Sequence, residues 1–301
     1  MPAGLMINNS TPDSLQNKLS FDSLIPSLFL LSFAFYSLSG FDTALVDDAS
    51  VLMLVGQGLA QGLVPYQDSF VIKGPLSSFL VAFGIKIGEW SGMPEIQSAR
   101  LMFSLFASFS ATSVYVLGRD MFRCRWVGLL SFLTLLSFFA YLHYISAGPR
   151  AKIPIVLFES LCLLNILHRR WFWVGLFSSL ALLTWQPTGL FCIAGLIFAF
   201  FSEQDRKKGL KSVVKLLFGS FLPILLFLSY FFLKDALKSF LDGFLLIHVS
   251  GVNNRAAISF QGLERFFIKH LGSNGFVAVA YVFPLYIFPQ DNGLETKAGK
   301  Q

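Results

Sequence analysis

The sequence predicts an all-α protein, a polytopic transmembrane helical bundle of about eight spans with short interfacial helices in its first outer loop. Composition is the first observation: 54% of the 301 residues are hydrophobic and 13% are charged, whereas soluble domains carry roughly 25% charged residues. The mean hydropathy of +0.65 is the second. The third is that long apolar runs alternate with short basic clusters. A water-soluble fold could not cover this much apolar surface with so few charges.

The net charge of +6 does not indicate nucleic acid as a partner, because no basic face with interleaved aromatic residues accompanies it. The basic residues form short clusters between apolar runs, as in loops that contact anionic membrane lipids. Cys124, Cys162 and Cys192 are too few and too scattered for a disulfide framework, and no CxxC or CxxH spacing predicts a metal site. Membrane lipids are therefore the expected surroundings.

The apolar runs give the order of the membrane segments. A polar N-terminus at 1–23, predicted to be cytoplasmic, lacks the basic start and cleavage site of a secretory signal. The transmembrane domain is predicted over 24–289, and the hydrophilic tail at 290–301 is expected to mark a compact or a truncated chain. The apolar runs lie at 24–44, 100–118, 126–145, 153–167, 171–184, 188–201, 212–233 and 274–289. The three between 153 and 201 are shorter than the roughly 17–25 residues of a spanning helix, which predicts tilted, broken or re-entrant helices there.

Loop charges predict the orientation of these segments. Basic clusters occupy 118–125, 168–170 and 202–215, and the last has five Lys and Arg against two acids. If all three face the cytoplasm, the spans alternate consistently and two long stretches, 45–99 and 234–272, lie outside. The first of these holds five acids and two lysines. The prediction is an integral protein of a bacterial inner (plasma) membrane, with 45–99 on the periplasmic side.

Two short interfacial helices are predicted in the first outer loop. Over 49–61, Leu52 and Val55 share one side while two glutamines four residues apart share the opposite one. The stretch 76–90 is apolar on one side but is interrupted by Lys86 and two glycines, which favours an interfacial or half-inserted helix.

Charge is concentrated in the stretch 46–76, which reads VDDASVLMLVGQGLAQGLVPYQDSFVIKGPL. Asp47 and Asp48 follow the first span directly, and Asp68 and Lys73 come one loop later. A carboxylate at a membrane end is partly desolvated, and desolvation raises its pKa toward that of a useful base. The loop is also longer than a plain connector, and its prolines restrict the backbone. The alternative is that these acids are merely solvated and that Lys73 is an ordinary interfacial lysine.

This stretch resembles the first outer loop of the GT-C glycosyltransferases, which include dolichyl-phosphate-mannose protein mannosyltransferases and bacterial aminoarabinose transferases. Members carry an acidic pair after the first span, then a helix, a glycine with a Pro-Tyr and an aspartate, and a Lys-x-Pro-Leu turn. The matching residues here are Asp47, Asp48, Gly62, Pro65, Tyr66, Asp68, Lys73, Pro75 and Leu76. The resemblance extends over about residues 25–200 through the stretches AR at 99–100, GRDMF at 118–122 and LLTWQPTG at 182–189.

The resemblance implies transfer of a sugar from a polyprenyl-phosphate donor to a lipid, glycan or protein acceptor. Glycosyl transfer with inversion needs a base for the attacking group, and Asp47 is the candidate. Asp48 would orient it, or the two would hold a divalent cation, Mg or Mn, if one is used. Lys73 would stabilise the leaving phosphate, with Arg150 and Lys152 as further donor-binding candidates.

The remaining residues of the motif are expected to shape the loop or contact substrate, namely Tyr66, Asp68 and Pro75. Two departures weaken the match: the acidic pair is Asp-Asp where relatives usually have Asp-Glu, and the chain is short. In addition, Trp185 stands where many relatives have lysine, and it would otherwise act as an interfacial anchor.

Other polar residues are weaker candidates. They are His143, His248, His270, Glu159 and Asn165. Two rival functions stay open: a transporter or flippase of a lipid-linked or small substrate, and an inactive truncated fragment of such an enzyme. A transporter is expected to face its ionisable residues toward each other at mid-membrane, whereas these acids lie at a membrane edge.

Overall fold

The computed structural model describes residues 22–46, 48–202 and 205–246, and every regular element in these ranges is a helix. The elements are α1 (Leu24–Leu38), α2 (Asp48–Ala60), α3 (Pro75–Ser91), α4 (Glu95–Phe122), α5 (Arg125–Ser137), α6 (Phe139–Ser146), α7 (Lys152–Leu167), α8 (Trp171–Thr184), η2 (Gln186–Thr188), α9 (Gly189–Phe201), α10 (Arg206–Leu233), α11 (Leu237–Leu241) and η3 (Asp242–Leu246). The apolar run at 274–289, most of the second outer stretch and the hydrophilic tail lie outside the described residues.

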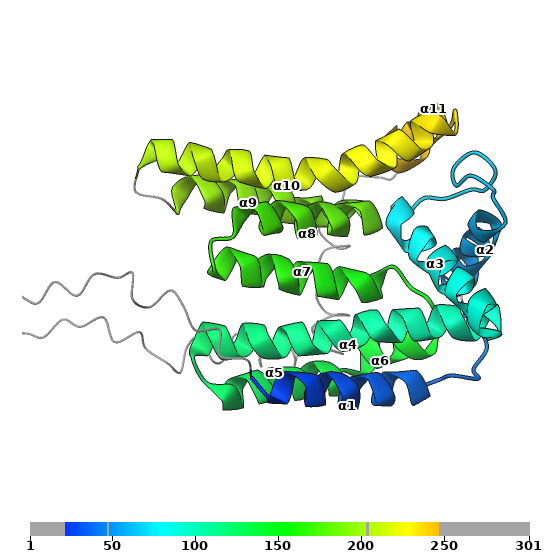
Figure 1. Ribbon diagram of the computed structural model, residues 1–301, viewed down its shortest axis with the longest axis horizontal. Coiled ribbons are helices and arrows are strands. Elements are labelled where there is room, and N and C mark those ends of the chain that lie inside the picture. The colour runs from blue at the N-terminus through cyan, green and yellow to red at the C-terminus, as the bar shows by residue number, and fades with distance from the viewer. Residues whose placement is uncertain (1–21, 47, 203–204, 247–301) are drawn as a thin grey trace, which may run out of the picture. The chain divides into compact units, whose positions relative to one another are not determined.

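The long helices lie side by side (Figure 1). α10 packs on α8, α8 on α7, and α7 on α4, while α1 and α5 pack on α4 and α9 packs on α8 and α10. α2 and α3 pack on each other, and α3 also contacts α4 and α8, all at one end of the bundle. α2 and α3 therefore lie at one end of the bundle.

Two helices, α4 and α10, are each 28 residues long and apolar enough to cross a membrane, and α5 with α6 makes a third if that bent pair is one span. The protein is thus an integral membrane protein built from helices. α1, α7, α8 and α9 are shorter helices of 15, 16, 14 and 13 residues. At 1.5 Å per residue, each spans less than the roughly 30 Å of a hydrocarbon core, so the expected number of about eight full spans is not confirmed.

Two predicted runs differ from the helices that form. The run at 24–44 is helical only to Leu38, since Gly40 takes a positive φ of 75° and starts an irregular connection. The run at 126–145 is broken at Phe138, where α5 and α6 are bent by 51°. At this break the Leu135 carbonyl accepts from the Phe138 amide at 3.3 Å and from the Tyr36 hydroxyl at 3.4 Å. A partner side chain on α1 therefore takes part in the bend.

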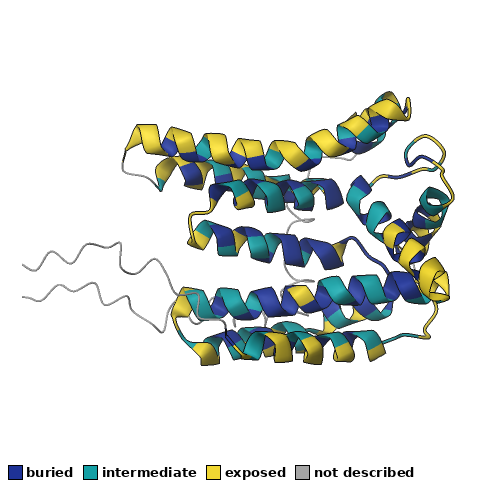
Figure 2. Ribbon diagram, in the orientation of Figure 1, coloured by how far each residue is buried: buried dark blue, intermediate teal, exposed yellow. Residues whose placement is uncertain are grey.

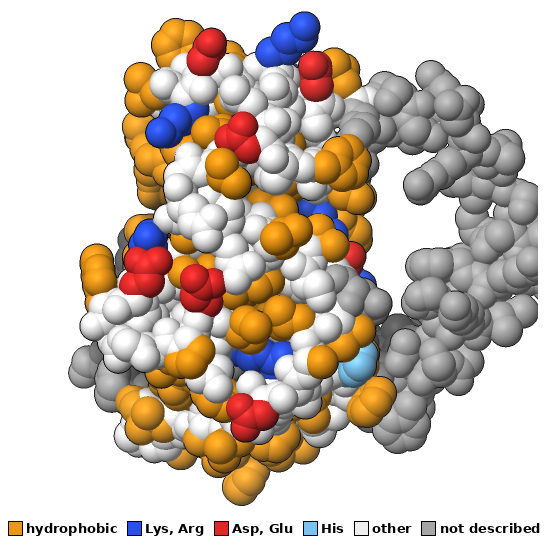
Figure 3. All heavy atoms as spheres, turned by 90° about the vertical axis from the view of Figure 1, so that its right-hand side faces the viewer, with side chains coloured by type: hydrophobic (Ala, Val, Ile, Leu, Met, Phe, Trp, Pro, Cys, Tyr) orange, Lys and Arg blue, Asp and Glu red, His pale blue; other side chains and the backbone are white. Residues whose placement is uncertain are grey.

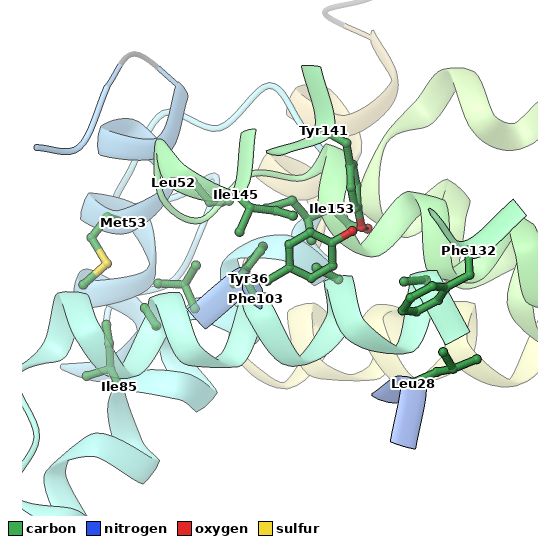
Figure 4. Close-up of a cluster of buried hydrophobic side chains, with 14 of the residues drawn as sticks. Leu28, Tyr36, Leu52, Met53, Ile85, Phe103, Phe132, Tyr141, Ile145 and Ile153 are labelled. Atoms are coloured by element: carbon green, nitrogen blue, oxygen red, sulfur yellow. The ribbon is translucent and has the colours of Figure 1, made fainter. Parts of the chain in front are cut away.

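The largest buried apolar cluster of the described residues has members on every helix from α1 to α7 (Figure 4). Tyr36, Phe103, Tyr141 and Ile153 are almost completely inaccessible, and the Tyr36 and Tyr141 rings meet edge to face at 6.0 Å. Alanines and serines form much of the buried face of α4. Such small residues let neighbouring backbones approach closely, which is how helices associate in lipid. On the outward side of α10, exposed residues predominate (Figure 2) and many are Leu or Phe, as expected for contact with lipid tails.

The two ends of the bundle differ in charge. We call the end that holds the α4–α5 turn, the α7–α8 turn and the start of α10 the basic end, because residues of the predicted basic clusters at 118–125, 168–170 and 202–215 lie there. There the buried Asp22 carboxylate accepts from Tyr115 at 2.6 Å and pairs with Arg119 at 3.1 Å. The opposite end, which we call the loop end, holds α2, α3, the 146–152 turn, the 184–189 turn and 234–246. Among the described residues, the basic clusters therefore lie at one end of the bundle, as the loop charges predict.

Candidate active site

The centre of the candidate site is an ion pair at the loop end. Lys73 Nζ lies 2.7 Å from Asp48 Oδ2, with side chains that are 27% and 52% exposed. Asp48 is the first residue of α2, and Lys73 precedes the Gly-Pro that starts α3. The start of α2 and the turn before α3 thus meet through Asp48 and Lys73, which are 25 positions apart in the sequence.

Arg150 and Lys152 approach the same carboxylate from the α6–α7 turn. Arg150 donates to the Val46 carbonyl at 3.2 Å, and its guanidinium lies 5.3 Å from the centre of the Tyr144 ring. Lys152 lies 4.5 Å from that ring centre and donates to the Tyr144 hydroxyl at 3.1 Å. The hydrogen bond from Lys73 lowers the pKa of Asp48 most, the charges of Lys73, Arg150 and Lys152 lower it further, and desolvation opposes them. One cation therefore pairs with this carboxylate, and the charges of two more act on it.

A buried arginine ties together the two connections that carry these residues. Arg100 at the start of α4 donates to the Gly40 carbonyl, to the Thr43 carbonyl at 2.6 Å, and to the Ser146 carbonyl at 3.0 Å. The Thr43 hydroxyl also donates to Ser146 at 2.7 Å. Gly148 has a φ of 118° and packs against the α1–α2 connection without a Cβ. Since one connection leads to Asp48 and the other to Arg150, this arginine fixes the distance between them.

The long loop before Lys73 is closed on itself. The Asp68 carboxylate accepts from the Val64 amide at 2.7 Å, and Tyr66, with a φ of 69°, donates from its hydroxyl to the Lys73 carbonyl at 2.5 Å. The half-buried Tyr66 ring packs against Phe231 and Phe240, which it meets edge to face. Burial raises the pKa of the Tyr66 hydroxyl, so this group stays protonated and remains a donor.

The other flank of the Lys73 turn rests on the end of α8. Pro75 is the first residue of α3, where a missing amide proton costs nothing. The Gly74 amide donates to the Thr184 carbonyl at 3.2 Å, and the Gln186 side-chain amide donates to the Ile72 carbonyl at 3.1 Å. The turn that presents Lys73 is therefore bonded on both sides to one neighbouring helix end.

The structure thus brings together Asp48, Lys73, Arg150 and Lys152, and it places Tyr66, Asp68 and Pro75 in the loop and turn that carry Lys73. Asp47 lies outside the described residues. Figure 3 views the loop end directly and shows acidic and basic side chains distributed between apolar ones on this face.

The weaker candidates do not join this cluster. The His143 ring stacks on Phe139 at 6.2 Å, and the Asn165 amide donates to the Leu161 carbonyl one turn back in its own helix at 2.7 Å. Glu159 lies half-buried midway along α7. His248 and His270 lie outside the described residues.

Sequence reasoning missed two residues that shape the site, Arg100 and Gln186. Both belong to stretches that carry the family resemblance, AR at 99–100 and the glutamine of WQPTG. A charged or amide side chain at a membrane end is itself a signal, because such a group must find partners there. The sequence does not show which backbone carbonyls accept hydrogen bonds from Arg100 and Gln186.

A divalent cation does not fit the described part of this site. Among the described residues no three His, Cys, Asp or Glu side chains come together as metal ligands. Around Asp48 the neighbouring charged groups are Lys73, Arg150 and Lys152. These cations repel a metal ion, which prefers several carboxylate oxygens. We therefore derive no step through a metal.

The chain was compared with known proteins. The family model for dolichyl-phosphate-mannose-protein mannosyltransferase matches residues 72–231, which run from the Lys73 turn almost to the end of α10. No curated protein and no solved structure matches the chain. The match includes Lys73, Arg150, Lys152 and Gln186, and it starts downstream of the acidic pair.

Proposed function

The chain belongs to the dolichyl-phosphate-mannose-protein mannosyltransferase family and is a membrane glycosyltransferase, and on that premise we propose which substrates and residues its site uses. The proposed reaction moves a hexose or pentose from a polyprenyl-phosphate donor to a lipid, glycan or protein acceptor, with inversion at the anomeric carbon. The observation that carries the proposal is the Lys73–Asp48 pair at 2.7 Å with Arg150 and Lys152 beside it.

The charges of this cluster suit a lipid phosphate. Within this cluster three cations and one described carboxylate leave an excess of positive charge, and a second carboxylate from Asp47 would still leave one positive charge in excess. A phosphate with a polyprenyl tail is an anion that reaches the enzyme from the bilayer surface. Cations held in place at the point where charge develops stabilise a leaving group more than mobile ones do, because they need not reorganise during the reaction.

The ion pair implies an exchange of partners. Lys73 is bonded to Asp48, and the phosphate oxygens of a donor compete for the same ammonium. When Lys73 turns to the phosphate, the Asp48 carboxylate is released next to the sugar that the phosphate carries. The charges of Arg150 and Lys152 still lower the pKa of Asp48 after Lys73 has turned away, so the carboxylate stays ionised.

In the proposed chemical step an acceptor hydroxyl attacks the anomeric carbon while the bond from that carbon to the phosphate oxygen breaks. The hydroxyl proton passes to the Asp47 carboxylate, which acts as the base, and Asp48 orients the acceptor or Asp47. The electron pair of the broken bond stays on the polyprenyl phosphate, where Lys73, Arg150 and Lys152 hold it. The direction of attack opposite the leaving group gives inversion.

The proposed orientation places the loop end on the periplasmic side of a bacterial inner membrane. Its support is the charge asymmetry of the bundle: the basic end carries Arg119, Arg123, Arg125, Arg169, Arg170, Arg206, Lys207, Lys208 and Lys211. An excess of Lys and Arg marks the cytoplasmic side of a membrane protein. At the loop end basic and acidic residues are balanced. The three cations of the site therefore do not make the loop end the more basic one, and the basic end stays on the cytoplasmic side in the proposed orientation.

The test is a transfer assay with membranes that contain the full chain. The membranes are incubated with a panel of polyprenyl-phosphate sugars, and glycosylated product is sought by mass. We expect product with at least one donor, and we expect its loss with Asp47→Asn and with Asp48→Asn. Glu89→Gln is the matched control, since it removes a carboxylate from another ion pair at the same end, with Lys86 at 2.9 Å. Absence of product with every donor, or normal transfer by both aspartate variants at normal protein level, would overturn the proposal.

A further inference from the structure

The backbone on both sides of Lys73 is fixed by residues on both sides of Trp185. The Gly74 amide donates to the Thr184 carbonyl at 3.2 Å, and the Ile72 carbonyl accepts from Gln186 Nε2 at 3.1 Å. The approach is close, because a Cβ on Gly74 would lie 2.0 Å from the Leu183 carbonyl oxygen. Hydrogen bonds on both sides of Lys73 therefore join its turn to the end of α8.

The same glutamine amide reaches a third segment. Gln186 Nε2 also donates to the Phe244 carbonyl at 3.2 Å, so both of its protons are used. Phe244 lies in the π-helical turn η3, and its ring stacks on Phe240 at 5.2 Å, which in turn stacks on Phe231 at 4.3 Å. One side chain thus joins the Lys73 turn, the end of α8 and the segment that follows α10.

Some of these contacts hold the three segments together, and one of them restrains the position of Lys73. The aromatic stack and the Gly74–Thr184 bond hold the segments together without Gln186. Gln186 adds a bond to the Ile72 carbonyl, on the other side of Lys73 from the Gly74–Thr184 bond, and this second bond limits the movement of the Lys73 backbone away from α8. A donor phosphate binds more tightly when the ammonium is already held where the phosphate oxygens arrive, because less backbone and side-chain freedom is lost on binding.

We propose that Gln186 is a positioning residue, which holds the Lys73 turn in register with the end of α8 and couples it to η3 so that Lys73 meets the donor phosphate. The proposal rests on the proposed function, because it assigns Lys73 to that phosphate. It adds a residue that touches neither the donor nor the reacting atoms.

The experiment measures donor binding and turnover separately on the purified full chain in detergent. Binding is read as the rise in melting temperature with a polyprenyl monophosphate that carries no sugar, and turnover as kcat and KM with the donor sugar. For Gln186→Ala we expect an apparent affinity for the monophosphate and a KM for the donor each weaker by about tenfold, the worth of one or two hydrogen bonds. We expect kcat to change by less than about threefold. A merely structural role would lower the melting temperature without ligand and leave KM unchanged.

Two further variants sharpen the result. Gln57→Ala is the matched control, because Gln57 is another loop-end glutamine whose amide donates to a side chain, Glu95, at 2.6 Å, away from the Lys73 turn. It should bind the monophosphate as the unmodified protein does. Gln186→Met keeps the side-chain length and removes the donor, so it replaces Gln186→Ala if the latter does not fold, and the same tenfold weakening is expected.

The outcomes separate the two proposals. If Lys73→Gln abolishes monophosphate binding while both Gln186 variants bind normally, the positioning role is wrong and the proposed function stands. If the unmodified protein neither binds the monophosphate nor forms product, and Lys73→Gln gives the same result, the proposed function is wrong. The positioning role of Gln186 is then wrong as well.

Discussion

Replacement of Lys73 by glutamine should leave the protein folded and remove its activity. The pair with Asp48 is short at 2.7 Å, yet its side chains are 27% and 52% exposed. Pairs this accessible are worth about 0.2–1 kcal/mol of stability, because water and salt screen them and ordering two side chains costs entropy. Loss of the pair should therefore lower the free energy of unfolding by at most about 1 kcal/mol, which is a shift of a few degrees in melting temperature.

The expected loss of activity is much larger. Lys73 is the cation proposed to stand beside the leaving phosphate, and removal of one donor to a developing oxyanion costs about 100- to 1000-fold in rate. Arg150 and Lys152 remain, so the lower end of this range, about 100-fold, is the expectation. The pKa of Asp48 should rise toward its ordinary value of 3.8 once its main hydrogen-bond donor is gone. Asp48 nevertheless stays ionised at neutral pH, and the loss cannot be ascribed to its protonation.

The sign of the pH dependence follows from the same pair. A carboxylate whose pKa is lowered by folding stabilises the protein above its unfolded pKa, and this stabilisation disappears as the pH falls through the lowered value. The contribution of the Lys73–Asp48 pair is therefore complete at neutral pH and is lost only below about pH 3.8. Melting temperatures of the unmodified protein and Lys73→Gln should converge in acid.

Both quantities can be measured on one preparation. Thermal unfolding in detergent gives the stability change, and transfer from the active donor gives the rate, with Lys86→Gln as the control for loss of an exposed lysine from an ion pair at the same end. Two results would refute the reasoning: transfer by Lys73→Gln within about threefold of normal, or a drop in melting temperature above about ten degrees. The second would mean that Lys73 holds the fold and is not a free functional cation.

Further predictions concern the turn around Lys73 and the need for metal. Tyr66→Phe removes the hydroxyl that donates to the Lys73 carbonyl at 2.5 Å but keeps the half-buried ring, so the donor KM should rise about fivefold with little change in melting temperature. Gly74→Ala places a Cβ 2.0 Å from the Leu183 carbonyl oxygen, so expression and melting temperature should both fall, whereas no such loss is expected from alanine at an open position. Trp185→Lys adds a cation opposite the Lys73 turn and should lower the donor KM a few-fold; an unchanged KM would show that position 185 does not face the donor. Chelation with EDTA should leave transfer intact because the charges of three cations act on the described site carboxylate, and recovery of a lost activity by Mg²⁺ or Mn²⁺ would contradict that.

The arrangement of the helices could be predicted from the sequence to a large extent. Apolar length predicted α4 and α10, and the loop charges predicted that the turns at 118–125, 168–170 and 202–215 share an end. The bend between α5 and α6 could not be predicted, because neither proline nor glycine marks it. It involves a hydroxyl from α1, a partner that is distant in the sequence.

The candidate site was predictable in its members and not in its geometry. Motif resemblance selected Asp48 and Lys73, and charge outside the membrane selected Arg150 and Lys152. That these four meet depends on how two connections pack, which Arg100 and a glycine without a Cβ determine. Such bonds to backbone carbonyls leave no pattern in the side-chain sequence, and so the residues that make them are the ones sequence reasoning overlooked.

The cations of the 146–152 turn give the strongest internal argument for a function at the loop end. In the proposed orientation these positive charges lie outside the membrane, against the usual bias, and a residue placed only to snorkel would extend its charge into water. Arg150 is instead buried, with its guanidinium next to the Tyr144 ring, and Lys152 donates to the hydroxyl of the same tyrosine. Both lower the pKa of Asp48. A guanidinium buried at this end of the bundle and two cations whose charges act on one carboxylate are what the proposed phosphate site requires.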